Sequence, residues 1–193
     1  MKHMISAVIA CTLTLLIGLA SSQTTGVVSN VQLKNRSGDP VQMETANIPL
    51  AENGSSVSNP SVRFRNTGKI ACKAYSIALL FSLSDGTHRR MVISEDRAAM
   101  GGPGANRGIQ PGQVMDRAST GSFPLKSGVT ITEVAVSLDY AELADGSHYG
   151  PDPDGMAYQF AGRRAVVQGE RTRLLLLYQQ KGADALLKDL QGQ

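Results

Sequence analysis

The sequence has no tryptophan, and its aromatic residues amount to 5% of 193 residues. Few rings are therefore available to stack against a sugar, which argues against a carbohydrate-binding platform. Neither sign of charge is in large excess: the formal net charge is +3, too small a bias to favour nucleic acid or an anionic membrane as a partner. No long apolar segment follows the N-terminal region, so we expect no membrane span in the mature chain.

Motifs of several common catalytic sites are also missing. The sequence contains no G-x-S-x-G elbow for a nucleophilic serine. The glycine-rich run at 101–108 is not followed by Gly-Lys-Ser/Thr, so it does not indicate a phosphate-binding loop. Glu133, Asp139 and Glu142 are left as candidates for a glycosidase, which needs two facing carboxyl groups. The solvent-facing side of a strand explains them better, and we assign no catalytic, cofactor-binding or metal-binding residue.

Residues 1–22 have the parts of a secretory signal peptide. Lys2 supplies the positive charge, residues 5–20 are apolar, and small residues precede the expected cleavage before Gln23. The apolar run is shorter than the roughly 20 residues of a membrane-spanning helix. The V-I-A-C sequence ending at Cys11 resembles a lipoprotein-processing box, but it lies too early in the apolar run. We expect a protein exported to the periplasm or the extracellular space.

Only Cys72 remains after this cleavage. One cysteine cannot form an internal disulfide, so the fold must depend on its packing. We interpret Cys72 as a small buried residue of a strand. Pairing with Cys72 of another chain is the alternative.

Residues 59–86 contain the strongest strand patterns. Val62 and Phe64 alternate with arginines, which is typical of a half-buried strand. The next run has a large apolar face and a nearly apolar face of small residues, so we expect a central strand covered on both sides. Asp85-Gly86 then predicts a tight hairpin. The large face consists of Tyr75, Ile77, Leu79, Phe81 and Leu83, and the small face of Ala74, Ser76, Ala78, Leu80 and Ser82.

Residues 129–140 form the second strong strand pattern. Val134, Val136, Leu138 and Tyr140 share one parity, whereas Ile131 has the other, so we predict a bulge between them or burial of both faces. Shorter strands are expected in four other places. These are 27–33, 41–43, 87–93 and the region around Val114.

Helical spacing begins only near the C-terminus. Asp154 can cap this helix, and Lys181-Gly182 predicts a stop before a short final helix at 183–190. The apolar run at 174–177 must be buried somewhere. We expect the long helix to cover the small-residue face around Ala74, Ala78 and Leu80. The residues at helical spacing are Met156, Phe160, Val167, Leu174 and Tyr178.

These patterns predict a mainly β fold, an antiparallel β-sandwich with a C-terminal α-helical extension. We expect a signal peptide at 1–22, the sandwich domain at 23–153 and a helical segment packed on it at 154–193.

Four short sequence motifs point to a known family. They are V-x-F-x-N at 62–66, A-Y at 74–75, I-Q-P-G at 109–112 and A-D-G-S at 144–147. With these features the chain resembles the immunoglobulin-like extracytoplasmic modules of bacteria, with FxLYD-type domains as the nearest named relatives. The resemblance spans about residues 62–150, and the F-x-L-Y-D string itself is absent from this sequence. It implies a non-catalytic module and assigns no functional residue.

Two segments, 85–88 and 145–148, share the pattern D-G-[ST]-H after a strand. One hypothesis is a metal site that contains His88 and His148. Zinc takes three or four protein ligands, however, and the mature chain offers only these two histidines and one cysteine. Two hairpin turns of the same type are the better interpretation.

Asp145, Asp152 and Asp154 lie close together in a sequence rich in glycine and proline. Carboxylates at such spacing can bind calcium, but Arg163 occupies the position where an EF-hand loop has its bidentate glutamate. A stiff loop that ends in a helix cap explains the three aspartates better.

The C-terminal segment is basic. One hypothesis is that it docks to an anionic lipid headgroup or a cell-wall polymer. The solvated face of an amphipathic helix is the better interpretation. The basic residues concerned are Arg163, Arg164, Arg171, Arg173 and Lys181.

The sequence thus predicts an exported, non-catalytic β-sandwich module that binds a protein or cell-envelope partner, without a cofactor. The contact surface is expected at the loop 94–108 or at an unpaired edge strand. One alternative is a secreted hydrolase with a site around His88 or His148. Another is a structural module that oligomerises through the helical face at 174–178. The partner and the oligomeric state stay open at this point.

Overall fold

The computed structural model describes residues 26–51, 54–99 and 108–192. The predicted signal peptide, the lipidation alternative at Cys11 and most of the predicted glycine-rich loop lie outside these residues. The described chain forms ten strands followed by one helix. The strands are β1 (Val31–Lys34), β2 (Val41–Asn47), β3 (Ser56–Ser58), β4 (Ser61–Asn66), β5 (Cys72–Leu83), β6 (His88–Asp96), β7 (Val114–Ala118), β8 (Ser122–Pro124), β9 (Ile131–Leu143) and β10 (His148–Tyr149), and the helix is α1 (Met156–Leu190).

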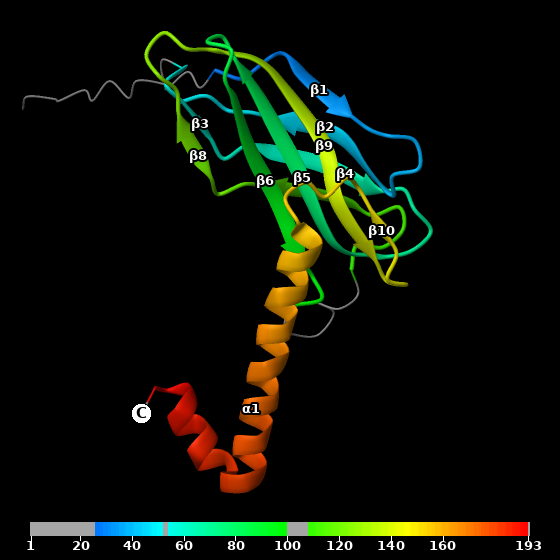
Figure 1. Ribbon diagram of the computed structural model, residues 1–193, viewed down its shortest axis with the longest axis vertical. Coiled ribbons are helices and arrows are strands. Elements are labelled where there is room, and N and C mark those ends of the chain that lie inside the picture. The colour runs from blue at the N-terminus through cyan, green and yellow to red at the C-terminus, as the bar shows by residue number, and fades with distance from the viewer. Residues whose placement is uncertain (1–25, 52–53, 100–107, 193) are drawn as a thin grey trace, which may run out of the picture.

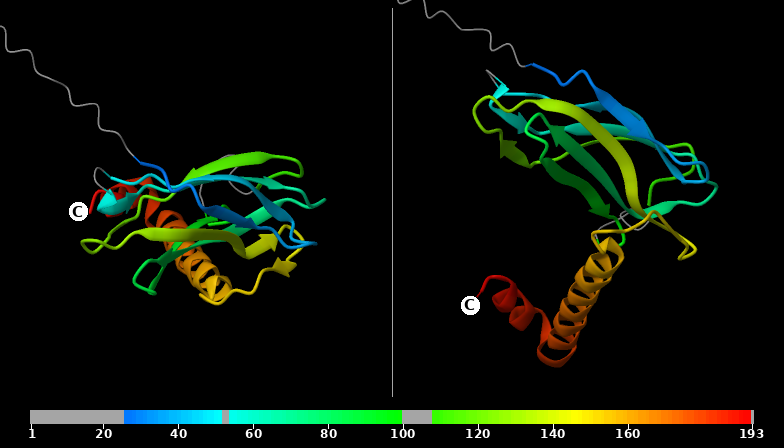
Figure 2. Two further views of the ribbon diagram at one scale, coloured as in Figure 1. Left: turned by 90° about the horizontal axis from the view of Figure 1, so that it is seen from above. Right: turned by 45° about the horizontal axis from the view of Figure 1, so that its top comes forward.

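The strands form two facing sheets (Figures 1 and 2). The larger sheet has the order β1-β9-β5-β6, with β10 also paired to β9, and the smaller sheet has the order β2-β4-β7. β3 and β8 form a separate short pair. All pairs are antiparallel except β1 with β9, which is parallel. The prediction of a mainly β sandwich with a C-terminal helix is confirmed.

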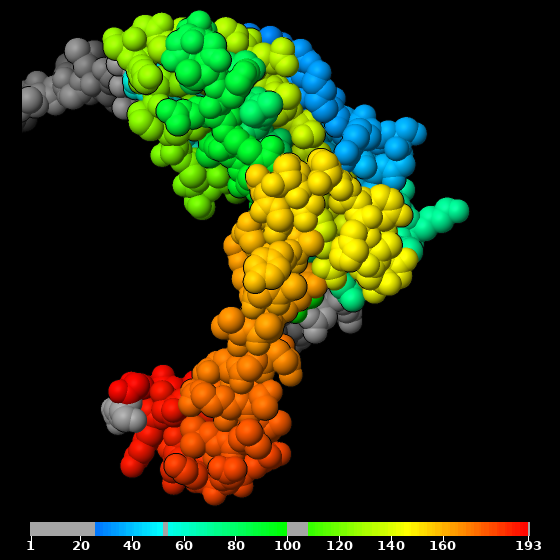
Figure 3. All heavy atoms as spheres, in the orientation of Figure 1, coloured from blue at the N-terminus to red at the C-terminus, as the bar shows by residue number. Residues whose placement is uncertain are grey.

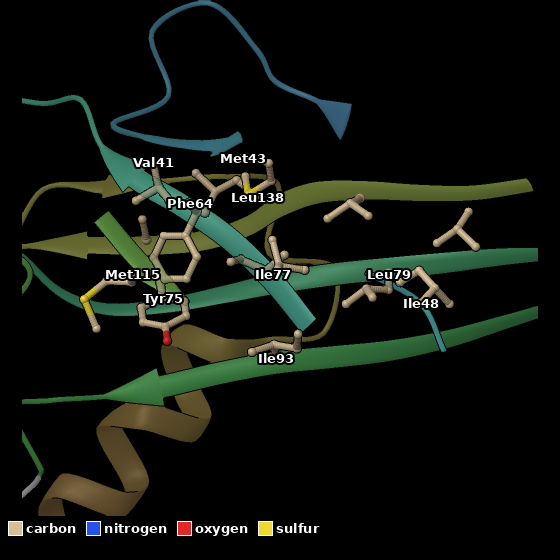
Figure 4. Close-up of a cluster of buried hydrophobic side chains, with 14 of the residues drawn as sticks. Val41, Met43, Ile48, Phe64, Tyr75, Ile77, Leu79, Ile93, Met115 and Leu138 are labelled. Carbon is tan, nitrogen blue, oxygen red and sulfur yellow. The ribbon is translucent and has the colours of Figure 1, made fainter. Parts of the chain in front are cut away.

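The core lies between the two sheets (Figure 4). Val62 and Phe64 of β4 point inward, and the ring of Phe64 lies 4.8 Å from the ring of Tyr75 on β5. All five large residues predicted for the inner face of β5 are buried. Each such side chain contributes about 2 kcal/mol through burial. β5 also lies between β9 and β6, so the prediction of a central strand is confirmed, although its small-residue face is only partly covered, since Leu80 is 40% exposed.

Glu95 ties the sheets together at their edge. Its carboxylate on β6 accepts hydrogen bonds from the Tyr75 hydroxyl (2.9 Å) and from Nε of Arg117 on β7 (2.7 Å). Burial opposes ionisation, yet the hydrogen bonds from Arg117 and Tyr75 hold the pKa of Glu95 below its usual value. The charged form of Glu95 therefore stabilises the closed sandwich.

The two D-G-[ST]-H segments are turns of the same type, as predicted. The carboxylate of Asp85 accepts hydrogen bonds from the backbone N–H and the hydroxyl of Thr87, and Asp145 does the same for Ser147. Each turn places a glycine in the left-handed region, with φ of 80° at Gly86 and 86° at Gly146. The polar residues of both segments thus satisfy their own turns.

Strand β9 contains two bulges. Thr132 lies between the pairs Leu83↔Ile131 and Ser82↔Glu133, which confirms the predicted bulge and brings Ile131 into phase with the core. Asp139 lies between Ile77↔Leu138 and Ser76↔Tyr140, and this second bulge was not predicted. It turns Tyr140 to the outer face of the sheet, so the prediction that Tyr140 shares the face of Leu138 is wrong.

Helix α1 leaves the sandwich soon after it begins (Figure 1). Its only buried side chains are those of Met156 and Phe160. The chain reverses at Gly182 (φ 81°), so that residues 183–190 return as a short second segment. This break confirms the predicted helix stop. In the described part of the chain, no helix is long and apolar enough to cross a bilayer.

Two predictions about the packing of α1 are wrong. The helix reaches Ala74 but leaves Leu80 40% exposed. The run at 174–177 is not fully buried, because Leu175 is 55% and Leu176 is 48% exposed. The helix does not lie across the sheet because ionic contacts near its start direct it away, as described below.

Candidate functional site

Two features beyond the core define the candidate site: the joint that attaches α1 to the sandwich, and the arm, residues 161–190, that extends from this joint (Figure 3). The joint has a small apolar cluster of its own on the outer face of the large sheet. Ala74, Tyr140, Met156 and Phe160 form this cluster, separate from the main core. The rings of Tyr140 and Phe160 lie 5.8 Å apart. The bulge at Asp139 is thus what supplies the helix with an aromatic partner.

The connection from β10 to α1 leaves no room for a side chain at Gly150. Its φ is 102°, and a Cβ there would lie 2.2 Å from the Asp139 carbonyl oxygen. Asp152 then caps the helix, since its carboxylate accepts hydrogen bonds from the backbone N–H of Met156 (2.5 Å) and of Ala157 (3.1 Å). The predicted cap, Asp154, is wrong: the N-cap position is Gly155, and the first free N–H groups of the helix are satisfied by Asp152 from three residues further back.

Arg164 fastens the helix to two strands at once. Its guanidinium forms a bidentate pair with Asp96 of β6 (2.8 Å) and bonds both carboxylate oxygens of Glu142 on β9 (2.8 Å). Ala74 of β5 lies in register between these two carboxylates, so the guanidinium crosses β5 over a small side chain. Asp96 is only 4% exposed, and its charge therefore depends on Arg164 for compensation.

A second arginine completes the joint. Arg90 of β6 bonds the bulged Asp139 (2.8 Å) and Asp154 (2.7 Å), which lies just before α1. The Ser76 hydroxyl donates a further bond to Asp139. Burial raises the pKa of Asp139 even though the charge of Arg90 opposes this shift. With Arg164, this contact fixes the direction in which the helix leaves the sheet.

These contacts show where the three carboxylates named as glycosidase candidates lie. Asp139 and Glu142 are held by arginines of the joint, whereas Glu133 pairs in register with Ser82 near the other end of β9. Glu133 therefore lies apart from the other two carboxylates, which are engaged in ion pairs of the joint.

The two histidines also lie apart. His88 is exposed and in register with Ser82 at one end of the large sheet, and His148 is in register with Glu142 at the other end. At about 3.3 Å per residue along β5, roughly 25 Å separates them. His148 Nδ1 lies 2.7 Å from the Tyr140 hydroxyl, so this histidine belongs to the rim of the joint. Within the described ranges, no group of three or more His, Cys, Asp or Glu side chains is arranged to hold a metal ion.

The three aspartates proposed for calcium have three different partners. Asp145 satisfies the turn at Ser147, Asp152 caps α1 and Asp154 pairs with Arg90. The interpretation as a loop that leads into the helix is confirmed except for the cap, which is not Asp154, and the calcium hypothesis loses its geometric basis.

Cys72 is free and fully buried. Its thiol donates to the Ala74 carbonyl oxygen at 3.2 Å. Burial raises the pKa of Cys72 to about 12. The interpretation of Cys72 as a buried strand residue is confirmed, and its burial leaves the Cys72 thiol inaccessible for pairing with another chain.

The arm ends in a helical hairpin with an apolar groove. The groove measures about 450 Å³ and lies between the two segments that meet at Gly182. Arg173 bonds Glu170 on its own segment and Asp189 on the returning one, so an ion pair holds the hairpin closed. The groove is lined by Leu174, Leu175, Tyr178, Leu186 and Leu190.

The basic face predicted for the C-terminal segment is partly neutralised. Arg164 and Arg173 are bonded to carboxylates, and Arg163 lies over the ring of Phe160 at 5.9 Å. Arg171 and Lys181 are exposed. Sequence spacing identified half of the groove, through Leu174 and Tyr178, but missed the returning leucines, because no local pattern shows that the two segments meet.

A second hollow, of about 620 Å³, opens at the other end of the sandwich. Val27, Leu50, Val129 and Ile131 give it an apolar side, and Lys126 lies among its lining residues. The Asn30 amide nearby is already bonded to the Thr132 carbonyl oxygen. Lys126 is the one charged side chain among the described lining residues, and the other polar groups are hydroxyls, an amide and backbone, so this hollow indicates no particular ligand.

Comparisons of the chain with protein-family models, with curated proteins and with solved structures found no match. A function must therefore be inferred from the geometry of this chain itself.

Proposed function

We propose that the protein is an exported, non-catalytic β-sandwich module that docks a partner in the cell envelope through its arm. Export is supported by the signal-peptide pattern at 1–22. The docking role is supported by the arm, which replaces the loop 94–108 as the favoured contact surface.

The exposed apolar surface of the arm is the observation that carries this proposal. A helix that is apolar on all sides, as at 174–178, is typical of a buried segment. Helices in proteins gain most of their stability from packing an apolar face against a neighbour. Contiguous exposed apolar surface therefore marks an interaction site. The side chains concerned, all near the end of the arm, are Leu175 (55% exposed), Leu176 (48%), Tyr178 (52%), Leu187 (54%) and Leu190 (62%).

The joint supports the same conclusion. Arg164 and Arg90 each bond two carboxylates across the joint, so the arm leaves the sandwich in a fixed direction. A fixed direction is useful for an arm that docks a partner, whereas a tail without such a role does not need it. Fixing the arm in advance lowers the entropy that a partner must overcome when it binds. The sandwich thus serves as a rigid base from which the groove is presented.

Site-specific photo-crosslinking in the producing cell tests this proposal. A photoreactive amino acid at Leu175 is expected to give a covalent adduct with a partner. The same amino acid at Asp116, which is 70% exposed on β7, is the control and is expected to give none. Equal adduct formation at both positions, or none at Leu175, would contradict docking through the arm.

A further inference from the structure

We infer that the partner of the arm is a second copy of this chain, and that two arms pack groove against groove about a two-fold axis. This inference rests on the proposed docking function of the arm and specifies its occupant.

The shape of the hairpin favours this occupant. Its two segments meet at Gly182 and open apart as a V (Figure 1). Apolar side chains of both segments line the groove between them. A two-fold axis places the same patch of both protomers in contact, so the assembly closes with no patch left over.

The size of the exposed surface also fits. Half-exposed side chains of this size each present on the order of 100 Å² of apolar surface, or about 400 Å² for the four on the groove side of the hairpin. An interface at the lower end of the stable range buries about 600 Å² per partner, and roughly 65% of a homodimer interface is apolar, which gives about 390 Å². One hairpin therefore carries about the apolar surface that one side of a small homodimer interface needs. The four are Leu175, Tyr178, Leu187 and Leu190.

The charge on the hairpin favours a copy over a lipid surface. Residues 170–190 carry four basic and three acidic side chains, and Arg173 is already bonded to Glu170 and Asp189. A helix that binds anionic lipid needs a clear excess of lysine and arginine on its polar face. A nearly balanced hairpin lacks that attraction, and it also lacks the repulsion that would keep two identical surfaces apart.

The test is the molar mass of the purified mature chain, residues 23–193, measured by light scattering and sedimentation from about 1 to 100 μM. A dimer is expected, with twice the mass of one chain. Leu175→Asp and Leu190→Asp each place a charge in the apolar groove and are expected to raise the dissociation constant at least about 100-fold. Gln168→Asp is the matched control, since it adds the same charge to an exposed polar position of the arm and is expected to leave the dimer intact. Circular dichroism verifies that each variant keeps its helix, and Leu190 lies on the returning segment, outside the core of the sandwich.

A monomer at all of these concentrations overturns the second copy as the partner. Photo-crosslinking at Leu175 to a different protein would then keep the docking function with another occupant, whereas no adduct would remove both. Co-sedimentation of a monomeric chain with vesicles of phosphatidylcholine and phosphatidylglycerol would also overturn the inference and assign the groove to a lipid surface. Dissociation of the dimer by Gln168→Asp as readily as by Leu175→Asp would refute the groove as the interface.

Discussion

Replacing Phe160 by alanine is expected to release the arm without unfolding the sandwich. Phe160 is fully buried, but its partners are the cluster of the joint and not the main core. Loss of a buried phenylalanine costs about 3–5 kcal/mol in a well-packed core. The cluster is small, so we expect about 3 kcal/mol, which is roughly a 150-fold change in the ratio of attached to detached helix. The free energy of unfolding of the sandwich should change by less than about 1 kcal/mol, because local opening need not involve the core.

The measurement is the distance between two spin labels, one at Asp116→Cys on β7 and one at Gln168→Cys on the arm. Cys72 does not interfere, since it is buried and its pKa is raised to about 12. The parent protein should give a narrow distribution of distances, and Phe160→Ala a broad one. Urea unfolding followed by near-ultraviolet circular dichroism reports the sandwich separately.

Tyr158→Ala is the matched control for this experiment. Tyr158 lies on the same helix two residues earlier and is 85% exposed, so its loss should leave the distances unchanged. A narrow distribution in Phe160→Ala would refute the view that the apolar cluster holds the arm. A loss of about 3 kcal/mol from the sandwich itself would show that the joint and the core unfold as one unit.

Three further outcomes follow from single residues. Gly150→Ala should destabilise the protein by more than about 2 kcal/mol in chemical denaturation, because the new Cβ would meet the Asp139 carbonyl oxygen. Gly146→Ala is the control: its Cβ would meet nothing within 4 Å, so we expect a cost of about 1 kcal/mol, from the positive φ alone. Cys72 should resist alkylation at pH 8 and react only after denaturation, as followed by mass spectrometry, since its pKa is about 12. The pKa of Glu95 is lower in the folded protein than its usual value of 4.5, so ionised Glu95 stabilises the fold at pH values above 4.5. This stabilisation is lost as the pH falls through the lowered pKa of the folded state. Glu95→Gln should therefore be less stable than the parent at pH 7 and less sensitive to acid, and an unchanged acid dependence of its thermal midpoint would contradict this account.

The sandwich was predictable from sequence because its signals are local. Alternation of large apolar residues on β4 and β5 identified the inner faces, and Asp-Gly pairs identified both hairpins. Tyr140 was misplaced because counting in steps of two cannot reveal an extra residue at Asp139. That bulge becomes visible only when the partner strand shows which residue has no counterpart.

The joint was not predictable as a unit. Its parts were identified one by one, but as candidates for unrelated chemistries, because the contacts that unite them join residues far apart in sequence. Arg164 lies 68 positions from Asp96 and 22 from Glu142, and no local pattern encodes such a pair. The residues named from sequence that the structure brings to the joint are Asp139, Glu142, His148, Asp152, Asp154 and Arg164.

The reversal at Gly182 also decides how the protein should be handled. It returns residues 183–190 toward the groove, so that Leu190 lines the groove. A purification tag or fluorescent fusion joined directly after Leu190 would be tethered beside the surface it is meant to leave free. Val27, in contrast, lies beside the hollow at the opposite end of the sandwich. A handle placed just ahead of Val27, after the predicted signal peptide, keeps the groove unobstructed.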